Sequence, residues 1–291
     1  MANTLRSVKT RINSTKSTAQ ITKAMYTVSQ SKVKRAEKTY KSYKDFMKRI
    51  KDIVSQMVEK GKEEYPHPLL KKREVKKTAY FIITSDRGLA GAYNSSIEKA
   101  LTEMIKNNHK SKDEYITAAV GKKGYFYLKK MGYPILKDEP TYVRDDVSFV
   151  DIAPLAKSFV EAYLNEEIDK LVIIYNHYVN SLTQEVTFEE LLPIKELKNE
   201  NEAADFVYET GIEKTLDLLL PMYVEDIVYG IILDAKTAEH SARMNSMKSA
   251  TDNADEIIAK LQLLYNRARQ SVVTNELIDI IGGANAIGGD E

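Results

Sequence analysis

The sequence has no cysteine among its 291 residues. Disulfides, thiolate metal sites, a cysteine nucleophile and redox control through a thiol are therefore excluded. Long apolar runs are also lacking, since stretches such as residues 79–83 and 171–175 are far shorter than the roughly 20 residues that cross a bilayer. No apolar leader-like segment follows Met1, so we expect a protein that is made and used on the cytoplasmic side.

Acidic residues are absent from the first 36 positions, which carry eight Lys or Arg. Residues 185–213 show the opposite bias, with nine Asp or Glu against two Lys, so a net charge of only +1 conceals a segregated charge distribution. Clustered basic residues could attract nucleic acid. The apolar positions among them are committed to helix packing, however, and we expect no nucleic-acid partner.

Proline and glycine are missing from the first 60 residues, which predicts one uninterrupted helix. Its apolar positions alternate three and four residues apart, the spacing of a coiled coil. We call these sixteen positions the first seam: Leu5, Val8, Ile12, Thr15, Ala19, Thr22, Tyr26, Ser29, Val33, Ala36, Tyr40, Tyr43, Met47, Ile50, Val54 and Met57.

A second helix is predicted over residues 212–281, with Gly282 and Gly283 expected to end it. Its distal part repeats the same alternation in a second seam: Met244, Met247, Thr251, Ala254, Ile258, Leu261, Tyr265, Ala268 and Val272. Because the intervening chain lets the second helix turn back, we expect the two seams to pair antiparallel.

Between the helices the pattern changes to short strands that alternate with shorter helices, which favours a mostly parallel sheet. Strands are expected at 78–85, 115–121, 170–179 and from Gln184, and helices at 95–107, 122–131 and 152–166. The predicted fold class is α/β: a long antiparallel two-helix coiled coil with an inserted Rossmann-like domain. The expected boundaries are 1–60 for the first helix, 61–210 for the globular domain and 211–291 for the second helix.

Groups that perform chemistry are sparse, and no catalytic, cofactor or metal site is predicted. The four histidines stand far apart, none at zinc-like spacing to another ligand. The segment ITSDRGLAGAYN (83–94) lacks the GxxxxGK[ST] and GxGxxG patterns of phosphate loops. We expect it to shape a strand-to-helix turn, with Asn94 or Ser95 capping the helix.

Extra apolar residues lie outside both seams. Ile21, Met25 and Val28 form another stripe on the first helix, and Val273, Leu277, Ile280 and Ile281 shift register on the second. Antiparallel pairing would bring both sets to one tip, which a third body would then surround. Docking within this chain, as a local helical bundle, is the alternative.

The sequence resembles the gamma subunit family of bacterial-type ATP synthases. The likeness rests on ITKAMYTVSQSKVKRAEK (21–38), TSDRGLAGAYN (84–94) and ARMNSMKSATDNADEIIAKLQLLYNRARQSVVTNELIDIIGGANAI (242–287), and it covers nearly the whole chain in order. Ala90 stands where many relatives carry Cys, and the regulatory dithiol insertion of the chloroplast version is absent, which excludes light-linked thiol control.

The resemblance implies a non-catalytic central stalk that carries torque between a proton-driven membrane ring (the c-ring) and three alpha and three beta subunits, and that regulates ATPase activity and proton flow. The implied location is peripheral, on the cytoplasmic face of a bacterial membrane. By resemblance, the catalytic-ring contact and coupling residues are Lys23, Met25, Arg243, Gln270, Thr274 and Glu276. Tyr208 and Glu209 match the foot that meets the c-ring and the epsilon subunit.

Two other functions stay open from the residues alone. A coiled-coil adaptor would bind partners at each end and form a stable, self-contained dimer. An enzyme with a Rossmann-like middle domain would need a pocket with convergent polar groups, and the sequence offers no such constellation.

Overall fold

The computed structural model describes residues 2–61, 67–195 and 211–287. Two long helices, α1 (Ala2–Gly61) and α5 (Ile212–Ile287), enclose the smaller elements in sequence. These are η1 (Pro68–Leu70), β1 (Thr78–Ile83), α2 (Tyr93–Asn108), η2 (Lys112–Glu114), β2 (Tyr115–Val120), α3 (Lys122–Met131), α4 (Phe149–Leu164), β3 (Lys170–Tyr178) and β4 (Gln184–Leu192). The chain divides into two compact units, residues 1–28 with 244–291 and residues 29–243.

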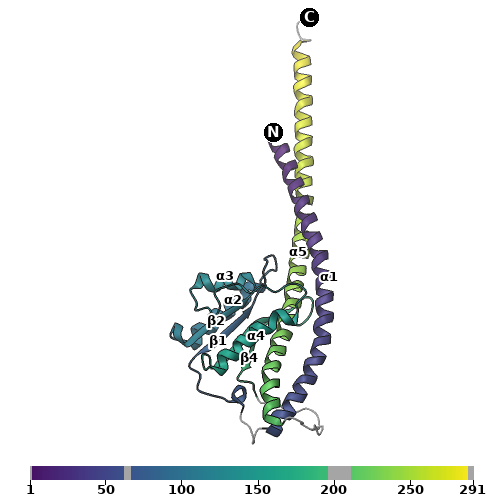
Figure 1. The fold of residues 1–291 in the computed structure, drawn as a ribbon. Helices are drawn as coiled ribbons and strands as arrows, with labels where there is room; N and C mark the ends of the chain where they lie inside the picture. Colours follow the sequence, from purple (N-terminus) through teal and green to yellow (C-terminus); the bar gives the residue numbers. More distant parts are fainter. Residues whose placement is uncertain (1, 62–66, 196–210, 288–291) are drawn as a thin grey trace. The chain divides into compact units, whose positions relative to one another are not determined.

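The first unit is an antiparallel helix pair formed by the start of α1 and the end of α5 (Figure 1). Ile12 and Ala19 of the first seam are buried, as are Met247, Ala254 and Leu261 of the second. The Oγ1 atoms of Thr22 and Thr251 are 2.8 Å apart, so even the polar seam positions meet across the pair. The described seam residues of this unit are all buried or half-buried, which confirms the predicted pairing.

The second unit is built on a four-stranded mixed sheet in the order β2-β1-β3-β4. β1 pairs in parallel with both β2 and β3, whereas β4 runs antiparallel to β3. The short 178–184 connection explains the antiparallel pair, because parallel neighbours need a crossover helix. The mostly parallel α/β sheet predicted from the sequence is confirmed.

Alternating residues of the strands fill two apolar cores, one on each face of the sheet. On one face, Phe81 and Ile173 join α4, the end of α1 and the first half of α5. On the other, Tyr80, Ile82 and Ile174 join α2 and α3. The sheet thus lies between two helical layers (Figure 1).

Two local predictions are wrong. Neither Asn94 nor Ser95 caps α2, whose N-cap is Ala92 without a side-chain hydrogen bond. Asn94 instead accepts from the backbone N–H of Ser85, just past β1, so tertiary geometry takes its side chain away from the helix end. Gly282 and Gly283 do not stop α5 either, since neither has a backbone of positive φ and the helix continues to Ile287.

Candidate functional site

The predicted ring-contact residues of α1 lie on the outside of the helix pair. Lys23 is exposed, and Met25 is half-buried beside the seam. Ile21 and Val28, in the same stripe as Met25, are 62% and 54% exposed. Together Ile21, Met25 and Val28 leave a continuous apolar stripe partly exposed on the paired helix, which favours contact with another protein.

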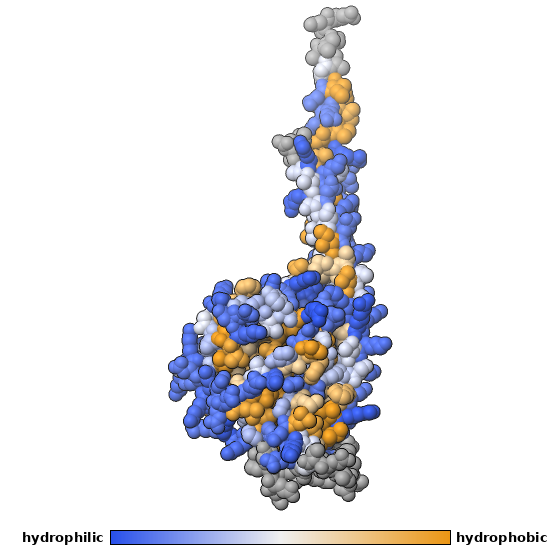
Figure 2. Space-filling view, viewed as in Figure 1, coloured by the Kyte–Doolittle hydropathy of each residue, from blue (hydrophilic) through white to orange (hydrophobic). Residues whose placement is uncertain are grey.

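The end of α5 continues past the first residues of α1 (Figure 1). The Thr22–Thr251 contact sets a register that places Leu5 near Ala268, so the helix beyond Val272 has no counterpart in α1. The prediction that Ile21 and Val273 would meet at one tip is therefore wrong, because this register places Ile21 opposite residue 252. This stretch, which we call the distal face, carries five apolar side chains that are 48–67% exposed: Val273, Leu277, Ile278, Ile280 and Ile281. Figure 2 shows apolar atoms gathered at this end of α5.

Helical geometry separates the predicted contact residues of this segment. At 100° per residue, Gln270 and Thr274 share the side of the helix that holds Leu277 and Ile281, roughly opposite the seam. Glu276 lies instead on the continuation of the seam side. All three side chains are exposed.

Arg243, in the other unit, is held within the chain. Its Nη1 lies 2.9 Å from Oε1 of Glu239, and its guanidinium donates to the carbonyl oxygens of Arg87 at 3.1 Å and Gly88 at 3.4 Å. Only 11% of the side chain is exposed. The 83–94 turn therefore binds a guanidinium through its carbonyl groups, a geometry opposite to that of an anion-binding loop.

Arg243 belongs to a buried ionic cluster that the sequence analysis missed. Glu239 also accepts from Lys236 at 3.0 Å, and the side chains of both are 5% exposed. Burial alone would raise the pKa of Glu239, but the cations Lys236 and Arg243 hold it below its ordinary value.

A second buried carboxylate joins α5 to the sheet. Asp234 lies 2.5 Å from Nδ1 of His177 and accepts from the backbone N–H of Tyr178 at 2.9 Å. Burial raises the pKa of Asp234, and the bond to His177 opposes that rise. This carboxylate therefore anchors the helix to β3.

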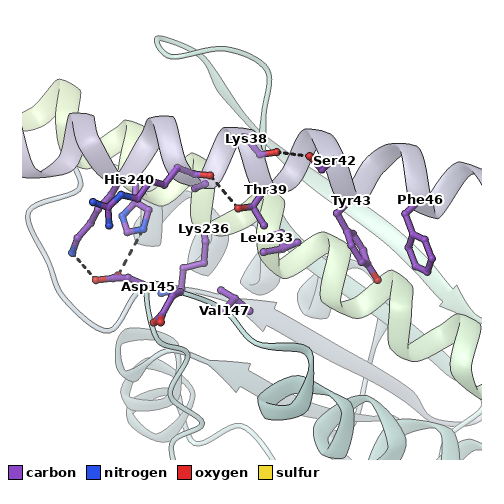
Figure 3. Close-up of a pocket in the computed structure, with 14 residues that line it drawn as sticks. Lys38, Thr39, Ser42, Tyr43, Phe46, Asp145, Val147, Leu233, Lys236 and His240 are labelled. Carbon is purple, nitrogen blue, oxygen red and sulfur yellow. Dashed lines mark hydrogen bonds and ion pairs between the residues drawn. The ribbon is translucent and has the colours of Figure 1, made fainter.

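His240 is another buried polar residue of this part of α5. It is 1% exposed, and burial lowers the pKa of the imidazole to about 4. Its Nε2 is 3.7 Å from Asp145, whose carboxylate also meets Nζ of Lys32 at 2.5 Å (Figure 3). The sequence does contain a signal for this buried cluster, because charged residues stand among the apolar residues of 231–242. The regular apolar stripe of the helix suggested instead that these charges face solvent.

Two predicted residues, Tyr208 and Glu209, lie outside the described residues. Among those described, no three His, Asp or Glu side chains are grouped closely enough to hold a metal ion. Nor does a helix in that part of the chain have the length and apolarity needed to cross a membrane.

Paired terminal helices around a mixed α/β sheet are the fold of rotor stalk subunits of ATP synthases. A family model described as ATP synthase matches residues 4–287, and the chain belongs to that family as one of its gamma subunits. A chain from the Tetrahymena thermophila mitochondrial ATP synthase central stalk and c-ring is 25% identical, with a TM-score of 0.58 over 79% of this chain and 99% of that one.

Two Euglena gracilis mitochondrial ATP synthase structures also match. A chain from the OSCP/F1/c-ring structure in rotational state 3 is 18% identical, with a TM-score of 0.68 over 100% of this chain and 97% of its own. A chain from the rotor structure in rotational state 1 is 17% identical, with a TM-score of 0.60 over 94% and 100%. At these identities the likeness shows the fold.

Proposed function

We propose that this protein transmits torque between a proton-driven c-ring and a catalytic ring of three alpha and three beta subunits, and performs no bond chemistry itself. The main observation in support is the distal face of α5, where five exposed apolar side chains have no counterpart in α1. A collar of partner subunits around such a helix end would bury this surface, at about 25 cal/mol for each Å² of apolar area removed from water.

Charge supports the same arrangement. The first 36 residues contain eight Lys or Arg and no acid, and most of these side chains, Lys23 among them, are exposed. Acidic loops of the beta subunits would complement this basic surface. Lys23, Met25, Gln270, Thr274 and Glu276 are the proposed contacts of unit 1.

Arg243 is proposed to affect coupling through the chain itself. It links α5 to the carbonyl groups of the 83–94 turn, while Glu239, one turn earlier on α5, holds the guanidinium in place. A load on α5 would reach the sheet domain through the two carbonyl bonds. A direct contact with the catalytic ring would use the 11% of its side chain that is exposed.

The remaining assignments rest on the family. Tyr208 and Glu209 are proposed to meet the c-ring and the epsilon subunit. The domain division at residues 60 and 210 remains a prediction. The proposed location is the cytoplasmic face of a bacterial membrane, reached through the complex, where this subunit would also regulate ATPase activity and proton flow.

Reconstitution tests the proposal. The chain is combined with its alpha and beta subunits, a visible probe is attached to an exposed position of the sheet domain, and ATP is added. Stepwise rotation in one direction is the expected result. A folded chain that fails to join an assembly-competent ring would instead support the coiled-coil adaptor.

A further inference from the structure

An open groove lies within the unit of residues 29–243, between α1, the segment 145–147 and α5 (Figure 3). Its volume is about 960 Å³, within the range of small-molecule sites. The α1 residues along it run from Lys32 to Phe46, a length of about 21 Å at 1.5 Å per residue. Neither the torque function nor the ring contacts proposed above involve this groove.

One end of the groove is rich in positive charge. Four cations line it, Lys32, Arg35, Lys38 and Lys236, but Lys32 is paired with Asp145 and Lys236 with the buried Glu239. Arg35 and Lys38 are exposed, so their charges face solvent without the cost of burial. These two cations, set against the carboxylate of Asp146, favour an anionic occupant.

His240 adds a polar atom deep at the same end. Its Nδ1 is buried and has no hydrogen-bond partner within the described part of the chain. A buried polar atom without a partner costs about 1–3 kcal/mol, which a ligand oxygen or hydroxyl would recover. The volume of the groove matches that of small-molecule sites, which favours a small molecule as its occupant.

The other end of the groove is aromatic. Tyr43 and Phe46 have ring centroids 5.6 Å apart, and Phe46 is 46% exposed. Between the two ends, the hydroxyls of Thr39 and Ser42 donate to helix carbonyl oxygens, which leaves their own oxygens free to accept. Basic, hydroxyl and aromatic groups thus follow one another along α1.

We propose that this groove binds an organic phosphate with an aromatic body, of the class of nucleoside polyphosphates. The phosphates lie against Arg35 and Lys38, next to the ion pair of Lys32 and Asp145. The sugar hydroxyls donate to Thr39 and Ser42, and the base stacks on Phe46. The order of basic, hydroxyl and aromatic side chains along α1 thus matches the order of phosphate, sugar and base in the ligand.

Calorimetric titration of the full chain with ATP, in magnesium-free buffer, tests the proposal. ATP should bind at one saturable site, and inorganic tripolyphosphate about tenfold more weakly because it lacks a base to stack. Phe46→Ala should lower the affinity for ATP about tenfold and leave the affinity for tripolyphosphate unchanged.

A matched pair of charge reversals on α1 provides the control. Lys38→Glu, in the groove, should lower the affinity for both ligands about tenfold or more, because it removes a charge-assisted hydrogen bond and adds repulsion between like charges. Lys44→Glu changes the net charge equally on the opposite side of the helix, where the side chain is also exposed, and should leave both affinities unchanged.

Three outcomes would overturn the proposal. They are no saturable binding of ATP at millimolar concentration, equal affinity for ATP and tripolyphosphate, and equal weakening by the two charge reversals. If an acidic amphipathic peptide bound the groove while ATP did not, the groove would be a docking surface for a protein.

Discussion

At the residue scale, one part of α5 buries charged side chains together with apolar ones. Residues 231–240 are buried on every side of the helix, although four of them are charged or ionisable: Asp234, Lys236, Glu239 and His240. Each carboxylate has a cationic or hydrogen-bonding partner within 3.0 Å. Burial here is tolerated because the charges are paired.

The pH dependence of stability should reveal His240. Its pKa is about 4 in the folded chain and 6.5 as a free side chain, so the unfolded state binds more protons between these values. Its contribution, up to about 3 kcal/mol, is present above pH 6.5 and lost as the pH falls toward 4. Urea unfolding across this window should show a steeper loss for the native chain than for His240→Gln.

Charged groups on the neighbouring elements affect the pKa of His240. Asp145 from the 145–147 segment and Glu239 from α5 favour the charged imidazole, whereas Lys236 and Arg243 oppose it. Lys32, on α1, meets the same Asp145. An NMR titration that placed the pKa of His240 near 6.5 would contradict the prediction, whatever the stability of the variant.

Met25 is the residue at which the coupling role can be tested. Met25→Lys adds a charge beside the half-buried seam edge, where the proposal places a beta-subunit loop. We expect fewer protons pumped per ATP hydrolysed, measured in vesicles that contain the whole complex. Met25→Leu conserves the apolar volume and should keep the native ratio, and an unchanged ratio in Met25→Lys would remove this residue from the contact.

At the element scale, two helical glycines should respond oppositely to alanine. A Cβ on Gly124, in α3, would lie 2.6 Å from Oγ1 of Thr84, whereas nothing lies within 4 Å of a Cβ on Gly282 in α5. Gly124→Ala should therefore destabilise the chain by about 1–3 kcal/mol through overpacking. Gly282→Ala should stabilise the helical state of its segment by up to about 1 kcal/mol.

Hydrogen exchange and thermal denaturation measure both changes. Slower exchange of the amides around residue 282 is expected in Gly282→Ala, with the melting temperature unaltered. A Gly124→Ala chain as stable as the native one would mean that Thr84 gives way without cost, and would refute the packing argument.

At the scale of the whole molecule, the distal face separates stability from function. The double variant Leu277→Asp/Ile281→Asp alters side chains that are 54% and 59% exposed, so the isolated chain should lose less than about 0.5 kcal/mol of unfolding free energy. In the reconstituted complex, however, two buried charges in an apolar collar should lower torque in the rotation assay.

Leu218→Asp supplies the control, because Leu218 is 64% exposed on the part of α5 that belongs to the sheet unit. It should affect neither stability nor torque. Native torque in Leu277→Asp/Ile281→Asp would show that the distal face does not transmit load.

Much of the fold followed from the sequence by itself. The three-and-four spacing selected the inward side chains from Leu5 to Met57, all of them buried or half-buried, because helical periodicity is local. The predicted helix 122–131 coincides with α3 because Gly121 and Gly132 flank it, both with positive φ. The exposed stripe of Ile21 and Val28 was visible for the same local reason.

The remaining features depend on contacts between parts of the chain that are distant in sequence. Asn94 caps no helix because Ser85 lies close enough to bind it, and Arg243 is held because the 83–94 turn presents two carbonyl groups to it. The burial of Asp234 and His240 likewise depends on partners from β3 and the 145–147 segment. Periodicity determines which side of a helix is apolar, but the number of sides that are covered depends on elements distant in sequence.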